Sequence, residues 1–381
     1  MAVNKLFFGN TNIRAAKLGS SDVKMYLGNT LVYELGEPVE TRVITTFNVT
    51  NTSSPTIIAG GRYVTGFSGV EIDGVVQPSA VSSYTFSTTG EHTIKYTLSD
   101  LTTINGGSFS GCTNLASVTL PDNVTNIGGN AFTYCSGLTS IDIPSGVTNI
   151  SNSAFLSCNG LTSIDIPSGV TSIGGNAFRS CTSLTSFTFE EGSQLTSIDT
   201  YTFQSCTSLT SINIPDSVTS IGSYAFYGCS GLTSIDIPSG VTTIGGNAFT
   251  NCSSLTSCTI GSGVTSIGGY VFQGCTSLTS IDIPSGVTNI GSSAFRGCTS
   301  LTSCTIGSGV TSIGNSAFAR CSGLTSITCN ATTAPTIQSA TFQNVKSNGI
   351  LYVPIGSSGY DTWMQNANYY LGLYNWTKVE Q

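Results

Sequence analysis

Cysteine is the side chain in this sequence with the greatest potential for chemistry, because there are 13 in 381 residues. Three of them, Cys258, Cys304 and Cys329, stand where other copies of a repeat carry isoleucine. The other ten recur every 23 residues, with one interval of 25: Cys112, Cys135, Cys158, Cys181, Cys206, Cys229, Cys252, Cys275, Cys298 and Cys321. The sequence contains no Cys-x-x-Cys pair that could chelate zinc, and free cysteine packs as a small apolar residue. We therefore expect an inward ladder of thiols rather than disulfides or metal ligands.

Histidine occurs once, so every common Ser-His-Asp, Cys-His or multi-His site would depend on His92. His92 lies in an alternating segment at 91–98 that predicts a strand, which favours a packed or surface histidine over a catalytic base. No nucleophile elbow and no phosphate-binding glycine motif accompanies it. We expect neither an enzyme activity nor a cofactor.

Aspartate recurs at one outward strand position in four copies of the repeat, at Asp142, Asp165, Asp236 and Asp282. Paired carboxylates can act on glycosides or bind calcium. On a flat strand face they lack a cleft and further oxygen ligands, so a solvated polar face is the favoured interpretation. Calcium binding and an enzyme acting on glycans stay open as alternatives.

The elements that must position these residues are copies of one repeat, marked by Phe109, Phe132, Phe155, Phe178, Phe203, Phe226, Phe249, Phe272, Phe295 and Phe318. Each copy reads A-F-x-x-C-x-x-L-T-S-I-x-I-P-x-x-V-T-x-I-G, and in the one long copy the turn is extended over residues 190–194. The Leu-x-x-Ile-x-Ile alternation predicts a strand buried on one face, which Pro or Gly then ends. A single copy cannot close a core, so the copies must stack in register.

This unit resembles the BspA-like leucine-rich repeat, which occurs in surface proteins of gut and oral bacteria, in some protist surface proteins and in bacteriophage proteins. The resemblance covers residues 101–333. It implies a mainly β fold containing a leucine-rich-repeat solenoid of about ten 23-residue repeats. A structural or binding role goes with such a scaffold.

We expect four domains: an N-terminal β attachment module at 1–36, an immunoglobulin-like β-sandwich at 37–102, the solenoid at 103–333 and a C-terminal cap at 334–381. Residues 89–96 resemble the last strands of immunoglobulin-like or bacterial surface modules. The first segment predicts short strands separated by Gly-Asn and Gly-Ser turns. It resembles N-terminal β-units of virion proteins from phages that infect gut bacteria. The aromatic-rich tail resembles the closing segment of BspA-like proteins.

The outward side chains of the predicted strand are uniform, because serine occupies one position in every copy from Ser117 to Ser326. Recognition needs local difference, and the difference concentrates just after each Phe. Tyrosine and arginine near that point are residues that interfaces favour. We therefore predict a binding ridge that contains Leu156, Arg179, Gln204, Tyr224, Tyr227, Tyr270, Gln273 and Arg296.

Charged residues make up only 8% of the chain and the net charge is −7, with no basic run that could neutralise successive phosphates. No segment approaches about 18 consecutive apolar residues, and the N-terminus lacks the apolar run of a secretory signal. We expect no nucleic-acid partner, no membrane insertion and no export by that route.

Two functions fit these patterns. The favoured one is a bacteriophage virion surface component, a fibre, decoration or receptor-binding protein that is made in the host cytoplasm and displays the solenoid for adhesion. Its partners would be other virion proteins through residues 1–36 and a host cell-surface protein or glycan through the solenoid. The alternative is a bacterial cell-surface or secreted adhesin that binds host proteins or other cells. A homo-oligomer stays open, because so short an N-terminal module buries little surface by itself.

Overall fold

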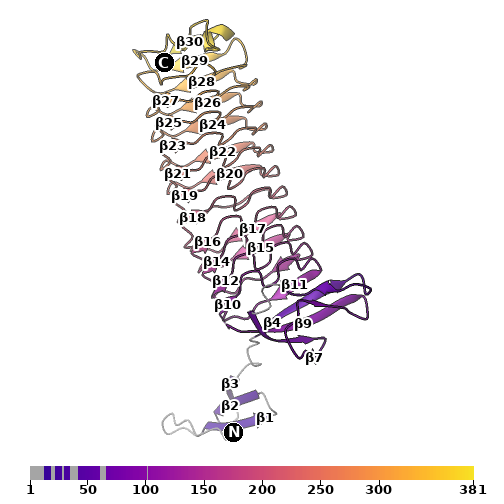
Figure 1. The fold of residues 1–381 in the computed structure, drawn as a ribbon. Helices are drawn as coiled ribbons and strands as arrows, with labels where there is room; N and C mark the ends of the chain where they lie inside the picture. Colours follow the sequence, from indigo (N-terminus) through magenta and orange to yellow (C-terminus); the bar gives the residue numbers. More distant parts are fainter. Residues whose placement is uncertain (1–12, 19–21, 28–29, 35–41, 61–65, 101) are drawn as a thin grey trace.

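The computed structural model describes residues 13–18, 22–27, 30–34, 42–60, 66–100 and 102–381. From residue 102 onward the chain winds into short turns that stack along one axis, so that equivalent strands lie side by side along the column in Figure 1. The regular structure of the described residues is almost entirely β. The mainly β fold and the repeat solenoid that the sequence predicted are confirmed.

Three short strands at the start of the described chain form an antiparallel sheet in the order β1, β2, β3. They are β1 (Ile13–Leu18), β2 (Asp22–Leu27) and β3 (Thr30–Glu34). Strands on both sides of short Gly-containing connections are what the turn pattern of this segment predicted. The rest of that pattern, residues 1–12 and the connections at 19–21 and 28–29, lies outside the described residues. Its use as an attachment module stays a prediction.

The next segment covers the first repeat of the solenoid. Its main sheet contains β4 (Arg42–Val49), β6 (Phe67–Ile72), β7 (Val75–Val76) and β9 (Gly90–Leu98), while β5 (Thr56–Ile57) pairs separately with β8 (Ser83–Tyr84). β4 also pairs antiparallel with β11 (Leu115–Thr119) of the first repeat, so one sheet runs from this segment into the solenoid.

The predicted immunoglobulin-like sandwich finds no support in this arrangement. The rings of Tyr96 and Phe67 lie 5.2 and 5.4 Å from that of Phe109, which places the segment and the solenoid in one hydrophobic core. The first repeat would otherwise expose an apolar end and an unpaired strand edge. The alternation of apolar and polar residues along a strand shows that one of its faces is buried. It does not show whether a second sheet or the first repeat of the solenoid covers that face, so the sequence pattern was compatible with both.

The predicted strand of each repeat builds the side of the column that we call the serine face, after its ladder from Ser117 to Ser326. Beyond β11 its strands are β13 (Ser140–Ile141), β15 (Ser163–Ile166), β17 (Ser186–Phe189), β20 (Ser234–Ile237), β22 (Ser257–Ile260), β24 (Ser280–Ile283), β26 (Ser303–Ile306) and β28 (Ser326–Cys329). Those that pair along this face do so in parallel, with serine beside serine, as Ser163 lies beside Ser186. The isoleucines point inward and are buried.

A second short strand per repeat, which the sequence analysis did not predict, builds another side that we call the second face. Its members are β10 (Thr103–Ile104), β12 (Asn126–Ile127), β14 (Asn149–Ile150), β16 (Ser172–Ile173), β18 (Ser197–Ile198), β19 (Ser220–Ile221), β21 (Thr243–Ile244), β23 (Ser266–Ile267), β25 (Asn289–Ile290) and β27 (Ser312–Ile313). The glycine that follows the strand is needed because the coils approach closely: a Cβ at Gly245 would collide with the backbone of Ser223.

The third side, which we call the Phe edge, consists of the turns that carry the Ala-Phe-x-x-Cys motif. The phenylalanine rings stack parallel up the core, with centroids 5.2–5.4 Å apart in most neighbouring pairs. The N–H of each Phe donates to the carbonyl of the residue that precedes the Phe of the next repeat, as from Phe132 to Ala154 at 2.7 Å. The ring stack and the backbone bonds therefore set the same spacing between coils.

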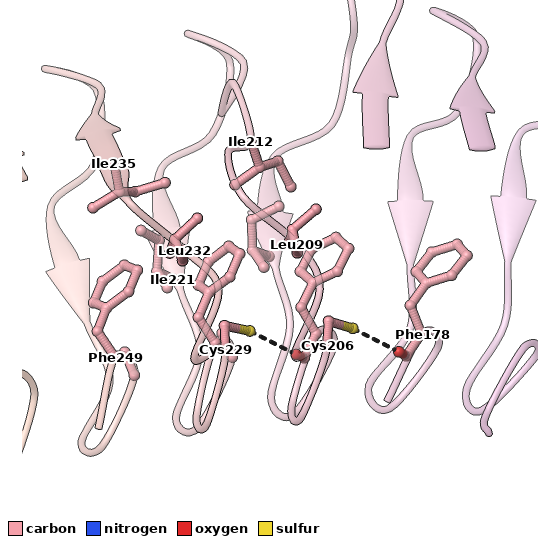
Figure 2. Packing of buried hydrophobic residues seen from close by; sticks show 14 of the residues in the cluster. Phe178, Cys206, Leu209, Ile212, Ile221, Cys229, Leu232, Ile235 and Phe249 are labelled. Carbon is pink, nitrogen blue, oxygen red and sulfur yellow. Dashed lines mark hydrogen bonds between the residues drawn. The ribbon is translucent and has the colours of Figure 1, made fainter. Parts of the chain in front are cut away.

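The ten repeat cysteines are free and buried, which confirms the predicted ladder of thiols. Each from Cys135 onward donates its S–H to the Phe carbonyl of the preceding repeat, with Sγ to O distances of 3.0–3.2 Å. Figure 2 shows two of these bonds, from the Cys206 thiol to the Phe178 carbonyl and from the Cys229 thiol to the Phe203 carbonyl. The cysteine is therefore a hydrogen-bond donor between coils and not only an apolar filler.

The C-terminal tail continues the serine face and covers the last coil. β29 (Ile350–Val353) and β30 (Thr377–Glu380) extend its sheet in parallel, and the 3₁₀-helix η2 (Leu371–Tyr374) lies between them in sequence. Trp363 is buried with its ring 5.3 Å from that of Phe342, and its Nε1 donates to the Pro335 carbonyl at 3.0 Å. The indole thus ends the ring stack while its polar atom stays hydrogen-bonded.

The thiol ladder makes the fold sensitive to alkaline pH. Burial raises the pKa of Cys181, Cys229 and Cys298 to about 12, whereas an exposed thiol has a pKa of about 8.5. Above that lower value the unfolded chain releases protons that the folded chain retains, so the stability is complete below about pH 8.5 and falls as the pH rises toward 12. Each such thiol should lower the free energy of unfolding by on the order of 1–2 kcal/mol at pH 10.

The measurement is the melting temperature by circular dichroism between about pH 8 and pH 10. A variant that combines Cys181→Ser, Cys229→Ser and Cys298→Ser is the matched control, because a hydroxyl can still donate to the Phe carbonyl but does not titrate in this range. Its melting temperature should fall less steeply with pH. An identical fall in both proteins would show that the thiols do not cause it.

Candidate binding surface on the Phe edge

The backbone of the Phe edge turns through two left-handed residues in every repeat from Phe109 to Phe318. One stands two positions before the Phe and the other two positions after it, with φ between 56° and 79°. Glycine, asparagine and serine hold most of these positions. Glycine and asparagine enter the left-handed region most readily, so the turn explains much of the polar composition of this edge.

Bulky side chains nevertheless occupy some of the left-handed positions. Tyr201, Tyr224 and Tyr270 stand before their Phe with φ of 62°, 59° and 63°, and Tyr134 and Arg320 stand after theirs with φ of 61° and 62°. A large L-residue in this conformation costs roughly 1–2 kcal/mol. Strain of this kind gathers at functional sites in proteins, where the surrounding fold enforces it.

Side chains from three successive repeats meet at one place on this edge, and we call them the aromatic cluster: Arg179, Tyr201, Tyr224 and Tyr227. The rings of Tyr201 and Tyr224 stack with centroids 4.9 Å apart and planes at 21°. The Tyr227 ring lies 5.7 Å from that of Tyr224, and the Arg179 Cζ lies 5.7 Å from the Tyr201 centroid. Stacking and cation–π contacts hold these side chains in position before any ligand arrives.

A backbone ladder behind the predicted ridge fixes the level of each of its residues. The N–H of the second residue after each Phe donates to a carbonyl of the next repeat. The acceptor there is the residue that directly follows the Phe. Ser157 donates in this way to Arg179 at 2.8 Å, Ser180 to Gln204 at 2.7 Å and Ser205 to Tyr227 at 2.8 Å. The variable side chains therefore start from a rigid and evenly spaced backbone.

The aromatic cluster contains three of the predicted ridge residues, Arg179, Tyr224 and Tyr227. Arg179 is exposed and the two tyrosines are half buried. Gln204 is also half buried, and its Oε1 is a buried oxygen without a hydrogen-bond partner among the described residues. The Gln204 oxygen is therefore a hydrogen-bond acceptor that is still available on the same edge as the polar groups of the aromatic cluster.

The other predicted ridge residues lie on the same edge but outside the cluster. Tyr270 is 42% exposed, and Leu156, Gln273 and Arg296 are half buried. Among the described residues no ring or cation–π contact joins any of these four side chains to the cluster. Their part in binding stays a prediction.

Some positions directly after the Phe serve the fold and not the surface. Thr133, Thr250 and Ala319 are buried, and the Thr133 hydroxyl donates to the Ser153 carbonyl at 2.7 Å. Variation at this position therefore reflects packing in some repeats and exposure in others. The sequence alone could not separate the two.

Sequence analysis missed Tyr201, which stacks at the centre of the cluster. The signal was present: Tyr201 stands two residues before Phe203, as Tyr224 stands before Phe226 and Tyr270 before Phe272. Tyrosine at this earlier left-handed position, and not only variation after the Phe, therefore marks the cluster in the sequence.

The candidates for catalysis have structural partners. His92 is buried, with Nδ1 2.7 Å from the Asp73 Oδ2, Nε2 3.0 Å from the Thr88 carbonyl and its ring 4.2 Å from that of Phe86. Both ring nitrogens are thus engaged in holding the segment that covers the first repeat. The buried thiols have raised pKa values, so they stay protonated donors and not nucleophiles.

The four strand aspartates point outward and are exposed, as predicted. Asp165 accepts a hydrogen bond from the Thr188 hydroxyl of the neighbouring strand. Within the part of the chain that the structure describes, no three His, Cys, Asp or Glu side chains gather in a way that could hold a metal ion. No helix of the described residues has the length and apolar character needed to span a bilayer.

Stacked coils with inward Leu, Ile and Phe ladders and variable turn residues on the outside define a leucine-rich-repeat protein. The family model described as BspA type leucine rich repeat region, in six copies, matches residues 79–206, 176–299 and 242–358. The chain belongs to this family of leucine-rich-repeat proteins.

Several solved structures of bacterial leucine-rich-repeat proteins are similar to the chain. One from T. pallidum is 28% identical, with 52% of this chain and 82% of that chain covered and a TM-score of 0.40. One from Bacteroides ovatus is 28% identical, with 65% and 85% covered and a TM-score of 0.28. A leucine-rich cell surface protein from Faecalibacterium prausnitzii is 26% identical, with 72% and 87% covered and a TM-score of 0.33. No curated protein sequence matches the chain.

The backbone strain at the tyrosines can be measured at Tyr270, whose ring stacks on no other ring among the described residues. Tyr270→Asn should raise the free energy of unfolding by about 1 kcal/mol, because asparagine tolerates the left-handed conformation. Asn247 holds the equivalent position one repeat earlier with φ 61°, so Asn247→Tyr should lower it by a similar amount. Urea unfolding followed by circular dichroism measures both changes, and the opposite sign in both variants would rule out the strain.

Proposed function

We propose that the protein is a non-enzymatic binding and adhesion protein whose ligand surface is the Phe edge around the aromatic cluster. The observation that supports this most is the placement of Tyr201 and Tyr224 in left-handed positions, where asparagine stands at Asn176 and Asn247. Folding alone gains nothing from a strained tyrosine at the surface, whereas a ligand gains a rigid ring with a polar tip. Membership of a family of surface proteins supports the same role.

The chemistry of the cluster fits a host cell-surface protein or glycan. Tyrosine rings offer flat apolar area together with a hydroxyl, and arginine offers several donors, so the pair is common at the energetic centre of interfaces. The low charge of the chain, 8% charged residues, leaves packing and neutral hydrogen bonds as the main sources of affinity. Prior stacking of the rings limits the entropy lost on binding.

The double variant Tyr201→Asn, Tyr224→Asn tests this surface. Asparagine suits both backbone positions, so the solenoid should stay folded while binding weakens roughly tenfold or more. Labelled full-length protein is applied to intact bacterial cells, to intact epithelial cells and to a printed glycan array, and bound fluorescence is measured. Tyr134→Asn is the matched control, because Tyr134 is likewise a left-handed tyrosine of the Phe edge but is exposed and lies outside the cluster. Equal binding by both variants and the unmodified protein would contradict the proposal.

The finer proposal is that the protein is displayed on a bacteriophage virion, attached through residues 1–36. It rests on the resemblance of that segment to N-terminal β-units of phage virion proteins. The alternative, display on a bacterial cell, draws on the name of the Faecalibacterium prausnitzii protein, which is described as a cell surface protein. Other virion proteins would be the partners in the first setting, and host proteins or other cells would be bound in the second.

Mass spectrometry separates the two settings. Peptides of the chain should be enriched in virions purified by density gradient from a lysing culture, and antibody against the solenoid should decorate those particles in electron micrographs. Peptides released by brief protease treatment of intact, uninfected cells are the comparison sample. Recovery only from the uninfected cell surface would overturn the virion proposal and leave the adhesion surface unaffected.

A further inference from the structure

One junction between coils differs from all the others that the structure describes. At each regular junction one threonine on the serine face and one on the second face bond to the preceding coil, and we call each such bond a threonine rung. The threonine N–H, and usually also its Oγ1, donates to a backbone carbonyl of that coil, as from Thr233 to Thr210 on the serine face and from Thr219 to Thr196 on the second face. Where the coil that runs through Phe178 meets the coil that runs through Phe203, both rungs are missing within the described chain. On the serine face, after each Phe, Thr210 does not bond to Thr185, and on the second face, before each Phe, Thr196 does not bond to Thr171. Residues 211–214 also form no strand.

The cause lies in the strand that precedes this junction. Both inward positions of β17 carry phenylalanine, Phe187 and Phe189, where other repeats carry smaller residues such as Ile164 and Ile166. The Phe187 ring stands edge-on to Phe178 at 5.0 Å and to Phe203 at 4.7 Å. It acts as a wedge, and the Phe178 and Phe203 rings are 5.8 Å apart instead of the usual 5.2–5.4 Å.

The Phe edge stays bonded across the same junction. Phe178 N–H donates to the Thr202 carbonyl at 3.0 Å, Ser180 N–H to the Gln204 carbonyl at 2.7 Å, and the Cys206 thiol to the Phe178 carbonyl at 3.1 Å. The two halves of the solenoid are therefore bonded along the Phe edge and lack the threonine rungs of the other two sides. At the turn beyond the serine face the Ser217 hydroxyl still donates to the Leu195 carbonyl at 2.7 Å.

The parted serine face forms a cleft. One part of about 320 Å³ lies between residues 185–189 and 211–213, and a second of about 540 Å³ continues between residues 189–193 and 213–217. In Figure 1 the cleft lies between the coil of β17 and the next coil, which has no strand on this face and is followed by the coil of β20. The larger part falls within the roughly 300–1,000 Å³ of ordinary ligand sites.

Two unpaired strand edges line this cleft. The β15–β17 ladder is parallel, so alternate residues turn both their N–H and their C=O to one neighbour. Ser186 faces the preceding repeat, because its N–H donates to the Thr162 carbonyl, and Phe187 and Phe189 therefore face the next repeat. By the same alternation the N–H and C=O groups of Phe187 and Phe189 face those of Ser211 and Asn213 across the opening, and within the described chain they do not bond to one another. Edges of this kind are templates for an added strand.

Charge is concentrated at one end of the cleft. Glu190, Glu191 and Asp216 line the wider part, beyond the C-terminal end of β17. No arginine or lysine lines either part. An extended chain lying parallel to β17 would bring its own C-terminal end beside these three carboxylates, where basic side chains complement them.

We propose that this cleft binds an extended peptide segment of a partner protein, added as a parallel strand between β17 and residues 211–214, with lysine or arginine at its C-terminal end. The peptide donates to and accepts from both edges, at Phe187 and Phe189 of β17 and at Ser211 and Asn213 on the other side. Its basic end pairs with the carboxylates of Glu190, Glu191 and Asp216. This site lies on a different side of the column from the aromatic cluster and does not depend on the ligand bound there.

The test uses the full-length protein and a fluorescein-labelled peptide of sequence LTSITIKK, followed by fluorescence anisotropy at low and high salt. Saturable binding that weakens with salt is expected. Phe187→Ile removes the wedge and restores the residue of the other repeats, so the coils should close and the affinity should fall about tenfold or more. The double variant Glu190→Gln, Glu191→Gln should weaken binding and flatten its salt dependence, while the cleft itself stays open.

Asp282→Asn, on the outward face of the closed strand β24, is the control for a general loss of negative charge and should bind the peptide normally. A peptide ending in two glutamates should bind more weakly, and one methylated at alternate amide nitrogens should lose binding because it cannot donate to β17. The proposal is overturned if the unmodified protein shows no saturable binding, or if it and the Phe187→Ile variant, shown to be folded by circular dichroism, bind equally.

Discussion

The hydrogen bonds at the phenylalanine carbonyl hold the coils of this solenoid in register. That oxygen accepts the N–H of the cysteine in its own repeat, as from Cys229 to Phe226 at 3.1 Å, and the S–H of the cysteine in the next repeat, as from Cys252 to Phe226 at 3.2 Å. The first bond shapes the turn and the second joins it to its neighbour. The cysteine position therefore needs a side chain that is small enough for the core and can donate a hydrogen bond. The thiol does both, and burial keeps it protonated.

Both binding sites that we propose lie where local side chains depart from the repeat. Along the Phe edge the backbone is fixed so firmly that it can carry tyrosine at left-handed positions, which produces the stacked pair of Tyr201 and Tyr224. On the serine face the substitution of Phe187 parts the strands, and the same junction survives because its Phe edge stays bonded. Both departures lie between the repeats of Phe178 and Phe226, so the two proposed sites fall near the middle of a uniform column.

Much of the fold could be read from the sequence because the repeat has one strict period. The inward positions of Phe, Cys, Leu and Ile follow from that period, as does the closing role of a decaying final repeat. The second strand at Asn149–Ile150 was not predicted, since two residues are too short to show an alternation. The donor role of Cys229 and the wedge of Phe187 depend on contacts between coils, which the residues of a single repeat do not encode. Tyr201 could have been found by aligning the position before each Phe.

Hydrogen exchange of individual amides, followed by NMR or mass spectrometry on the unliganded protein, tests most directly whether the Phe edge holds the stack. At the junction after Phe178, the amides of Phe178 and Ser180 should be as protected as those of Phe203 and Ser205 one repeat later. The amides of Thr196 and Thr210 should exchange far faster than those of Thr219 and Thr233. Equal protection of the two pairs of threonines, or rapid exchange at Phe178 and Ser180, would contradict this account.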